Sequence, residues 1–423
     1  MVNADGTDLH RIARCRCDLR GSRPDFYESV AWSLDGTRIA LRTRKRRKHD
    51  PPRRIRRDHG RDAAGTRRHP VTGTRPFRCG VRRARTDAVT SLPVALAIAA
   101  VSAAGALATS SHATPPKLDR QTYTRELHKL ADRDSGAAVA IVVTPEGTWK
   151  GAAGFADFQA KRRAEPDDRF AIESTTKTFV ATVVLQLVRD RRLDLHDTVQ
   201  QWLPGLFPAH PLITIRQLLN HSSGIPSDFA LSEAPLVRAK RIAAQGVLFE
   251  PGTSSAYSNS DFVLLGLIVE KVTGRPLDQV VTNRIIRRLH LRGTSYGTDR
   301  AQRMTPWLGQ VENFGRPVSG DGGIISTVED VATFFRALLG GKLLPQKQLA
   351  EMKRTIATDR PDLRYGLGIW RYRVPCGFAW GHGGLASYAL DVEVARDGSK
   401  AVVWAVNNPA PSDWSFGDRL YCA

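Results

Sequence analysis

The sequence is poor in cysteine and methionine, and it lacks the short motifs of common metal sites. Five cysteines and three methionines occur among 423 residues, with neither a Cys-x-x-Cys pair nor a His-Glu-x-x-His segment. Such motifs supply the closely spaced ligands of structural and catalytic zinc. The sequence therefore predicts no metal site and no cofactor, and it argues against a zinc finger or a zinc protease.

An evenly spread positive charge is also missing. The net charge is +21, but residues 1–90 hold 24 lysines and arginines against 10 acidic residues and so carry +14 of it. The rest of the chain, with 39 basic and 32 acidic residues, is much closer to balance. A surface that coats nucleic acid needs a dense basic patch. We therefore expect no nucleic-acid partner for the main domain.

Residues 1–80 form a basic N-terminal arm. The arm has no periodic apolar face, which predicts a disordered segment or upstream sequence read in error, with the natural start near Val81. Within it, residues 28–41 resemble one strand–turn–strand unit, which cannot bury an apolar face alone. A basic arm that binds nucleic acid or anionic lipid is the functional alternative.

A short apolar stretch follows the arm. Residues 89–108 are nearly all small or apolar, three arginines precede them, and a small-x-small site ends at Ala113. This order predicts a signal peptide over residues 81–113, and hence a secreted or cell-envelope protein. The apolar run 94–107 is short and rich in alanine, which disfavours the alternative of an uncleaved membrane anchor.

Residues 119–423 show the pattern of one α+β domain. Strand-like segments open and close it, at 137–143, 148–155, 387–394 and 401–406. Helical patterns fill the middle, at 178–188, 262–272 and 327–339. Strands at both ends with helices between them predict a mostly antiparallel sheet, built from adjacent N- and C-terminal strands and flanked by helices.

The first of three candidate catalytic clusters is Ser-Thr-Thr-Lys at 174–177, at the start of an apolar helix. Ser174 and Lys177 share one helix face, so the amine can accept or orient the serine proton. Free N–H groups and the positive dipole end at a helix N-terminus suit an oxygen that becomes an oxyanion. The pattern alone is common, however, and Ser174 could simply cap the helix.

The other two clusters are Tyr-Ser-Asn at 257–259 and Gly-His-Gly-Gly at 381–384. A phenol beside a lysine loses its proton more readily and can act as a general base, while the Asn259 amide can donate and accept. Glycines let a substrate backbone approach closely, and His382 offers a polar or cationic group. The plain alternatives are a half-buried tyrosine, a helix-capping asparagine and a glycine turn with a surface histidine.

Together the clusters resemble the serine β-lactamase and penicillin-binding family, in its order Ser-x-x-Lys, Tyr-x-Asn and His-x-Gly. The variant motifs are similar to those of the class C and D-alanyl-D-alanine carboxypeptidase branch. The resemblance spans residues 120–423 and implies a β-lactamase/transpeptidase-like fold with an all-helical subdomain. It also implies a disulfide between Cys376 and Cys422, in keeping with export.

The resemblance implies a role for each cluster. Ser174 would be the acylated nucleophile, and Lys177 would accept or orient its proton. Tyr257 would serve as general base, Asn259 would hold the substrate amide, and His382 would assist at the third motif. Backbone N–H groups of Ser174 and Leu385 would form the oxyanion hole. The further residues expected along the bound substrate are Gly383, Gly384 and Trp370.

The implied activity is that of a secreted serine hydrolase with an acyl-enzyme, first of all a D-alanyl-D-alanine carboxypeptidase acting on peptidoglycan peptides. Trp370, however, stands where close relatives offer an arginine for the substrate carboxylate, and the third motif lacks their hydroxyl residue. Arg371 or Arg373 could substitute from one strand face. An esterase, a broader amidase and a class C-like β-lactamase therefore stay open.

The expected partners are small molecules or peptides: D-Ala-D-Ala peptides, β-lactams or esters. A membrane would be a partner only if the signal segment stays uncleaved. A catalytically silent module that binds penicillin or peptidoglycan in the same cleft is the alternative outside enzymes.

Overall fold

The computed structural model describes residues 30–32, 38–40, 119–134, 136–297, 317–408 and 411–423. The chain divides into two compact units, Met1–Ala103 and Ala104–Ala423. In the first unit, β1 (Val30–Trp32) and β2 (Arg38–Ala40) pair antiparallel, as expected of a strand–turn–strand segment. Most of the basic arm and the whole predicted signal segment, residues 81–113, lie outside the described residues. Within the described ranges, every helix is too short or too polar to cross a bilayer.

The second unit carries the candidate site. Its strands are β3 (Ala137–Thr144), β4 (Gly147–Asp157), β5 (Arg162–Arg163), β6 (Phe170–Ala171), β7 (Ser295–Tyr296), β8 (Ile324–Ser326), β9 (Ile356–Ala357), β10 (Leu363–Tyr365), β11 (Trp370–Val374), β12 (Gly377–Gly381), β13 (Gly384–Leu385), β14 (Ala389–Val394) and β15 (Ala401–Val406). Its α-helices are α1 (Arg120–Asp134), α2 (Thr176–Arg189), α3 (Val199–Trp202), α4 (Ile215–Leu219), α5 (Pro235–Ala243), α6 (Asn259–Thr273), α7 (Leu277–Val281), α8 (Val328–Leu339), α9 (Gln346–Met352) and α10 (Phe416–Cys422). A 3₁₀ turn spans Glu173–Thr175, and a π-helical turn spans Thr282–Ile286.

The main sheet is antiparallel, and the first long strand of the unit lies beside the last. The strand order is β5-β4-β3-β15-β14-β12-β11-β10-β9, with β13 paired to β14. Along the central pair, Ala138 faces Val406 and Val143 faces Ala401. A smaller sheet has the order β6-β8-β7. The predicted α+β fold, with its adjacent terminal strands, is confirmed.

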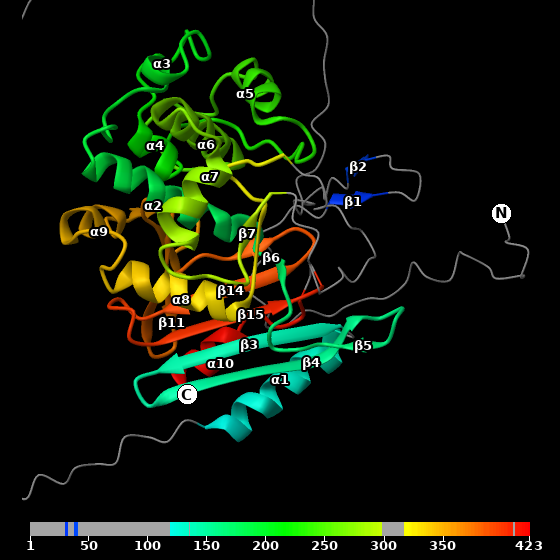
Figure 1. The fold of residues 1–423 in the computed structure, drawn as a ribbon. Coiled ribbons are helices and arrows are strands. Elements are labelled where there is room, and N and C mark those ends of the chain that lie inside the picture. Colours follow the sequence, from blue (N-terminus) through cyan, green and yellow to red (C-terminus); the bar gives the residue numbers. More distant parts are fainter. Residues whose placement is uncertain (1–29, 33–37, 41–118, 135, 298–316, 409–410) are drawn as a thin grey trace, which may run out of the picture. The chain divides into compact units, whose positions relative to one another are not determined.

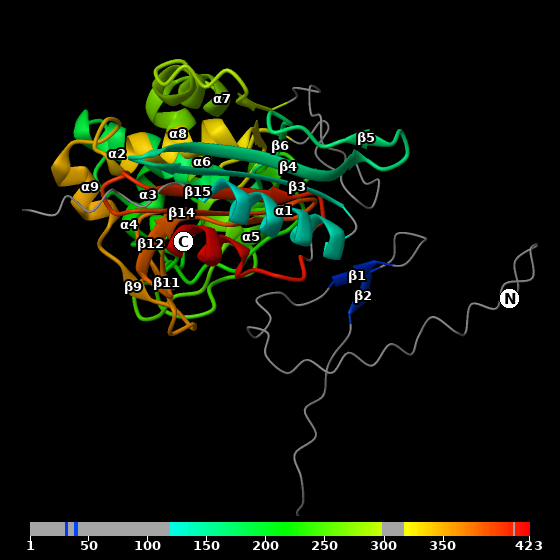
Figure 2. The same cartoon turned by 90° about the horizontal axis from the view of Figure 1, so that it is seen from below.

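Both faces of the central strands are covered, because their side chains alternate between two apolar cores. On β3, the odd-numbered residues 137–143 enter one core and the even-numbered residues 138–142 enter the other. Helix α8 contacts the sheet on the first side, whereas α1 and α10 contact it on the second (Figures 1 and 2). A strand buried on both faces needs an almost unbroken apolar run, which explains the sequence of β3.

Helices α2 to α7 form the expected helical subdomain, on the α8 side of the sheet (Figure 1). At its centre, α2 is buried from Thr176 to Leu187. Phe179 of α2 stacks on Phe334 of α8, with ring centroids 3.6 Å apart. Because the turn that carries Ser174 leads directly into α2, this packing fixes Ser174 relative to the sheet.

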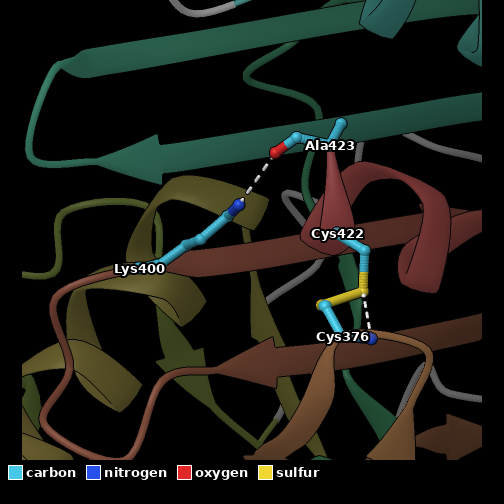
Figure 3. Close-up of a disulfide and its surroundings, with 4 residues drawn as sticks. All are labelled: Cys376, Lys400, Cys422 and Ala423. Carbon is cyan, nitrogen blue, oxygen red and sulfur yellow. Dashed lines mark hydrogen bonds between the residues drawn. A yellow bond between two sulfur atoms is a disulfide. The ribbon is translucent and has the colours of Figure 1, made fainter. Parts of the chain in front are cut away.

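A disulfide joins the C-terminal helix to the β11–β12 hairpin (Figure 3). Cys376 lies in the turn of the hairpin and Cys422 ends α10, with their Cα atoms 5.6 Å apart. The Cys376 N–H donates to Cys422 Sγ, and Lys400 Nζ donates to the carbonyl oxygen of Ala423, 3.2 Å away. The pairing implied by the family resemblance is therefore present.

Replacing both cysteines, Cys376→Ser with Cys422→Ser, should lower the free energy of unfolding by about 3–4 kcal/mol. The cross-link spans 46 residues, so its loss gives the unfolded chain more conformational freedom. Urea unfolding of both proteins followed by tryptophan fluorescence measures the difference. A reductant should lower the midpoint of the wild type alone, and equal midpoints for the oxidised wild type and the variant would contradict the expectation.

Candidate active site

The first two sequence clusters meet at the buried ammonium group of Lys177. Its Nζ lies 2.9 Å from Ser174 Oγ, 2.8 Å from Asn259 Oδ1 and 3.1 Å from the backbone oxygen of Asp321. The Lys177 side chain is 0% exposed. A buried ammonium is stable only when its three donors are satisfied, and these acceptors can take all three.

Ser174 lies in the 3₁₀ turn, and its two neighbours fasten that turn to the third motif. Thr175 Oγ1 donates to the backbone oxygen of His382 at 3.0 Å, and the Glu173 carboxylate accepts from the Ser387 N–H at 3.3 Å. Glu173 adopts a φ of +46°, which is uncommon for a residue other than glycine. The surrounding contacts hold this conformation and thereby set the direction of the Ser174 side chain.

Strand β13 lies directly against the turn of Ser174. A Cβ atom at Gly384 would come within 2.5 Å of the Ile172 carbonyl oxygen and 2.4 Å of Leu390, whereas one at Gly383 would meet nothing nearer than 3.5 Å. Close packing therefore requires glycine at position 384. It brings the backbone of Leu385 near Ser174, where the expected oxyanion hole would lie.

Tyr257 packs beside Lys177, between aromatic neighbours. The centroid of its ring lies 5.1 Å from Lys177 Nζ. The same ring stacks on Trp370, with centroids 6.0 Å apart and planes 11° from parallel, and its centroid lies 4.5 Å from that of His221. Asn259 begins α6, and its N–H donates to Ser227 Oγ at 3.0 Å. The second motif thus offers a phenol and an amide to the same lysine.

His382 is buried, with both ring nitrogens engaged. Nδ1 lies 2.6 Å from the carbonyl oxygen of Gly383, which can only accept, so Nδ1 carries the proton. The Tyr365 hydroxyl then donates to Nε2, 3.0 Å away. Burial, together with the charge of Lys177, lowers the pKa of His382 to about 3. Of the two roles expected for His382, the geometry fits the polar one, because the imidazole stays neutral and holds the loop.

Sequence reasoning missed a buried histidine–carboxylate pair behind the second motif. His221 Nδ1 lies 2.8 Å from Asp261 Oδ2, and Ser223 Oγ donates to the other oxygen at 2.5 Å. The Ser258 N–H lies 3.3 Å from His221 Nδ1. Burial raises the pKa of Asp261 well above its ordinary value and lowers that of His221, which favours an uncharged pair. The Asn-His-Ser-Ser-Gly segment at 220–224 was the available signal, but its partner lies 40 residues away.

Trp370 occupies the position where close relatives were expected to carry an arginine. It starts β11, is 8% exposed and packs on Tyr257. Arg371 and Arg373 do not replace that arginine, because both lie over the Phe378 ring, with guanidinium carbons 4.0 Å and 5.7 Å from its centroid. Successive side chains of a strand point to opposite faces, so Arg371 and Arg373 share one face and Trp370 lies on the other.

A cleft opens beside the aromatic cluster. Tyr257 and Trp370 line a small cavity of about 20 Å³, which shares Asn220, Ser255, Thr358 and Asp359 with a cleft of about 780 Å³. Among the described residues, no group of three or more His, Cys, Asp or Glu side chains could hold a metal ion.

A family model described as Beta-lactamase matches residues 125–420 of the chain. Among solved structures, a D-stereospecific amidohydrolase from Streptomyces sp. is 32% identical; the match covers 72% of this chain and 98% of that one, with a TM-score of 0.59. The D-amino acid amidase from Ochrobactrum anthropi SV3, complexed with L-phenylalanine amide, is 24% identical over 71% of this chain and 94% of that one, with a TM-score of 0.63. The second likeness concerns the fold alone.

Curated relatives match more distantly. "Protein flp" of Staphylococcus aureus (strain N315) is 30% identical over 189 residues, which are 41% of this chain and 38% of that protein. The chain thus spans less than half the length of this relative. The "Putative penicillin-binding protein PbpX" of Bacillus subtilis (strain 168) is 26% identical over 64% of this chain and 69% of that protein.

Gly384→Ala and Gly383→Ala form a matched pair of variants for the contact between β13 and the Ser174 turn. Gly384→Ala should lower the free energy of unfolding by about 1–3 kcal/mol, because the methyl group meets backbone and side-chain atoms that cannot withdraw. Gly383→Ala should change it by less than about 0.5 kcal/mol. Urea unfolding of the two variants measures both values, and equal effects would contradict the described packing.

Proposed function

The chain belongs to the Beta-lactamase family, and we propose that it is a serine hydrolase that cleaves amide bonds of D-amino acid derivatives through an acyl-enzyme on Ser174. The observation that carries the proposal is the contact of Lys177 Nζ with Ser174 Oγ at 2.9 Å, held from behind by Asn259 and Asp321. A serine hydroxyl is a weak nucleophile until a neighbouring base takes its proton. The lysine and the adjacent phenol of Tyr257 are the groups placed to do this.

The reaction proceeds in two acyl-transfer steps. In the first, Ser174 Oγ attacks the amide carbon while its proton passes to the unprotonated member of the Lys177–Tyr257 pair. The backbone N–H groups of Ser174 and Leu385 stabilise the oxyanion, and the same proton goes to the departing nitrogen as the C–N bond breaks. In the second step, water loses a proton to the pair and attacks the ester carbon. Its hydroxyl stays with the acid, and Ser174 recovers its proton.

We infer the substrate class from the aromatic wall of Tyr257 and Trp370 beside Lys177 and from the similar proteins. Stacked Trp370 and Tyr257 present aromatic surface where a carboxylate-binding arginine was expected. A leaving group without charge, such as the ammonia of a primary amide, suits this wall better than a free carboxylate, because a buried unpaired charge is costly. The Streptomyces protein, 32% identical, is a D-stereospecific amidohydrolase, which supports D-configuration on the acyl side.

D-alanyl-D-alanine carboxypeptidase activity is the second candidate. The cleft of about 780 Å³ next to the aromatic wall favours it, since a peptide can be accommodated there. Export of the protein belongs to both versions of the proposal. The signal-like segment 81–113 supports it, and so does the disulfide, because such bonds persist in oxidising compartments.

Labelling by a fluorescent penicillin tests the acyl-enzyme. The wild type should take up one covalent label, and Ser174→Ala should take up none and should hydrolyse D-phenylalanine amide at least about 10³-fold more slowly. Ser258→Ala, which alters a neighbouring hydroxyl that follows Tyr257, is the matched control and should still label. A wild type that neither labels nor releases ammonia from D-amino acid amides would support the silent binding module instead.

Trp370→Arg tests the substrate preference. The substitution restores a cation at the expected carboxylate position, so it should raise the ratio of kcat/KM for a diacyl-D-Ala-D-Ala peptide to that for D-phenylalanine amide by about tenfold or more. Trp370→Phe, which keeps an aromatic ring, should leave this ratio within about threefold of the wild type. If Trp370→Arg lowers both activities equally, Trp370 does not select the leaving group.

A further inference from the structure

Behind Lys177 lies a charged cluster centred on Arg238, which the three motifs do not include. Arg238 belongs to α5 and is 0% exposed. Its Nη1 and Nη2 donate to the two carboxylate oxygens of Asp321 at 3.2 Å and 2.9 Å. Its Nε donates to Asp228 Oδ1, and its Nη2 donates to the Asp228 carbonyl oxygen, both at 3.0 Å. One guanidinium group therefore ties two separate segments together.

One of the two segments contains a partner of Lys177, and the other is hydrogen-bonded to such a partner. The Asp321 backbone oxygen accepts from Lys177 Nζ. Asp228 follows Ser227, whose Oγ accepts from the N–H of Asn259, and Asn259 Oδ1 accepts from the same Nζ. Arg238 is thus bonded directly to one residue that accepts from the lysine ammonium, and it is linked to a second one through Ser227.

The stability of the fold does not by itself explain a buried ion pair of this kind. The desolvation of buried charges often cancels their attraction, so apolar residues of similar size would stabilise the fold as well. An arginine fork that meets a carboxylate with two hydrogen bonds does fix geometry, because the bond directions are set by its planar shape. The placement of this pair directly behind the lysine points to a positional role.

We propose that Arg238 is a positioning residue for Lys177. Its pairing with Asp321 and Asp228 fixes the Asp321 carbonyl and, through Ser227, the Asn259 amide at the spacing that keeps Lys177 Nζ directed at Ser174 Oγ. The inference rests on the proposed acyl-transfer function and adds a residue from α5 to the machinery that supports it.

The pairing also sets the electrostatic surroundings of Lys177. Burial opposes the ionisation of Asp321, but the charge and hydrogen bonds of Arg238 hold the pKa of Asp321 below its ordinary value. The negative charge of the Asp321 carboxylate therefore stays near Lys177, and the guanidinium group of Arg238 balances it. Other titratable groups near Lys177 include His221, Tyr257, Asp261 and His382.

Arg238→Met should lower the rate constant for acylation by a fluorescent penicillin by about 10- to 100-fold, because a displaced lysine no longer orients the serine. The KM for D-phenylalanine amide should stay within about threefold of the wild type, since Arg238 does not touch the substrate site. Arg238→Lys keeps the charge but cannot bridge both carboxylates, so it should recover part of the rate.

Arg241→Met is the matched control. Arg241 lies one turn further along α5 and also pairs with Asp228, at 2.8 Å, but its second carboxylate partner is Glu233 and not Asp321. Its loss should leave the acylation rate within about twofold of the wild type. Thermal unfolding of every variant establishes that it is folded at the assay temperature.

Asp321→Asn tests the role of the charge through the pH profile of kcat/KM, which a purely structural role would leave unchanged. The variant keeps the shape but removes the negative charge, which favours the unprotonated amine, so the acid limb of the pH profile of kcat/KM should move to lower pH by about half a unit or more. This pH profile also tests whether the Arg238–Asp321 pair acts on Lys177 if Arg238→Met does not fold.

Three results would overturn the inference: an Arg238→Met rate equal to the wild type, equal losses in Arg238→Met and Arg241→Met, or an unmoved acid limb in Asp321→Asn. A wild type that takes no penicillin label and hydrolyses no amide contradicts the proposed function instead. The two failures are therefore distinguishable.

Discussion

The burial of a single ammonium group constrains the whole candidate site. Lys177 can keep a charge away from water only if oxygen atoms surround it, and those oxygens come from the turn before α2, from the start of α6 and from the segment before β8. Three segments that lie far apart in the sequence must therefore meet at one point. The packing of α2 against α6, α7 and α9 and the stacking of Phe179 on Phe334 provide the rigid frame for that meeting.

The third motif and the aromatic wall beside this charge are built from neutral groups. His382 is kept uncharged because burial and the nearby charge of Lys177 lower its pKa, and the Tyr365 hydroxyl is hydrogen-bonded to it. Tyr257 and Trp370 complete an aromatic wall. A wall of this kind recognises a substrate by shape and contact area rather than by charge, and it leaves the polarity of the site to the lysine, the serine and the backbone N–H groups.

Local patterns made much of the molecule predictable, and long-range contacts account for what was missed. Ser174 and Lys177 lie three residues apart, so their contact follows from helix geometry alone. The strand patterns at the two ends of the domain predicted that the first and last long strands are neighbours, as β3 and β15 are. By contrast, Arg238 meets Asp321 across 83 residues. Nothing in the short-range pattern of a polar helix such as α5 shows that one of its arginines is buried.

The neutral state of His382 was equally hidden from sequence, since it depends on burial and on a tyrosine 17 residues away. The choice between Arg371 and Arg373 shows an intermediate case. Strand alternation correctly limited the available faces, but the position of Phe378, which draws both guanidinium groups to one side, needed the hairpin register. Charge and tautomer at a site are properties of the assembled surroundings, whereas spacing is a property of the chain.

The central position of β3 beside β15 has a consequence for how the molecule comes into being. The strand that starts at Ala137 can pair with β4 as soon as that hairpin is made, but it gains its second neighbour, β15, only when the segment up to Val406 has been synthesised. The centre of the main sheet is therefore completed only after the whole helical subdomain has been synthesised. Until β15 is made, one edge of the β3–β4 hairpin has no partner strand, and the two halves of the sheet stay separate.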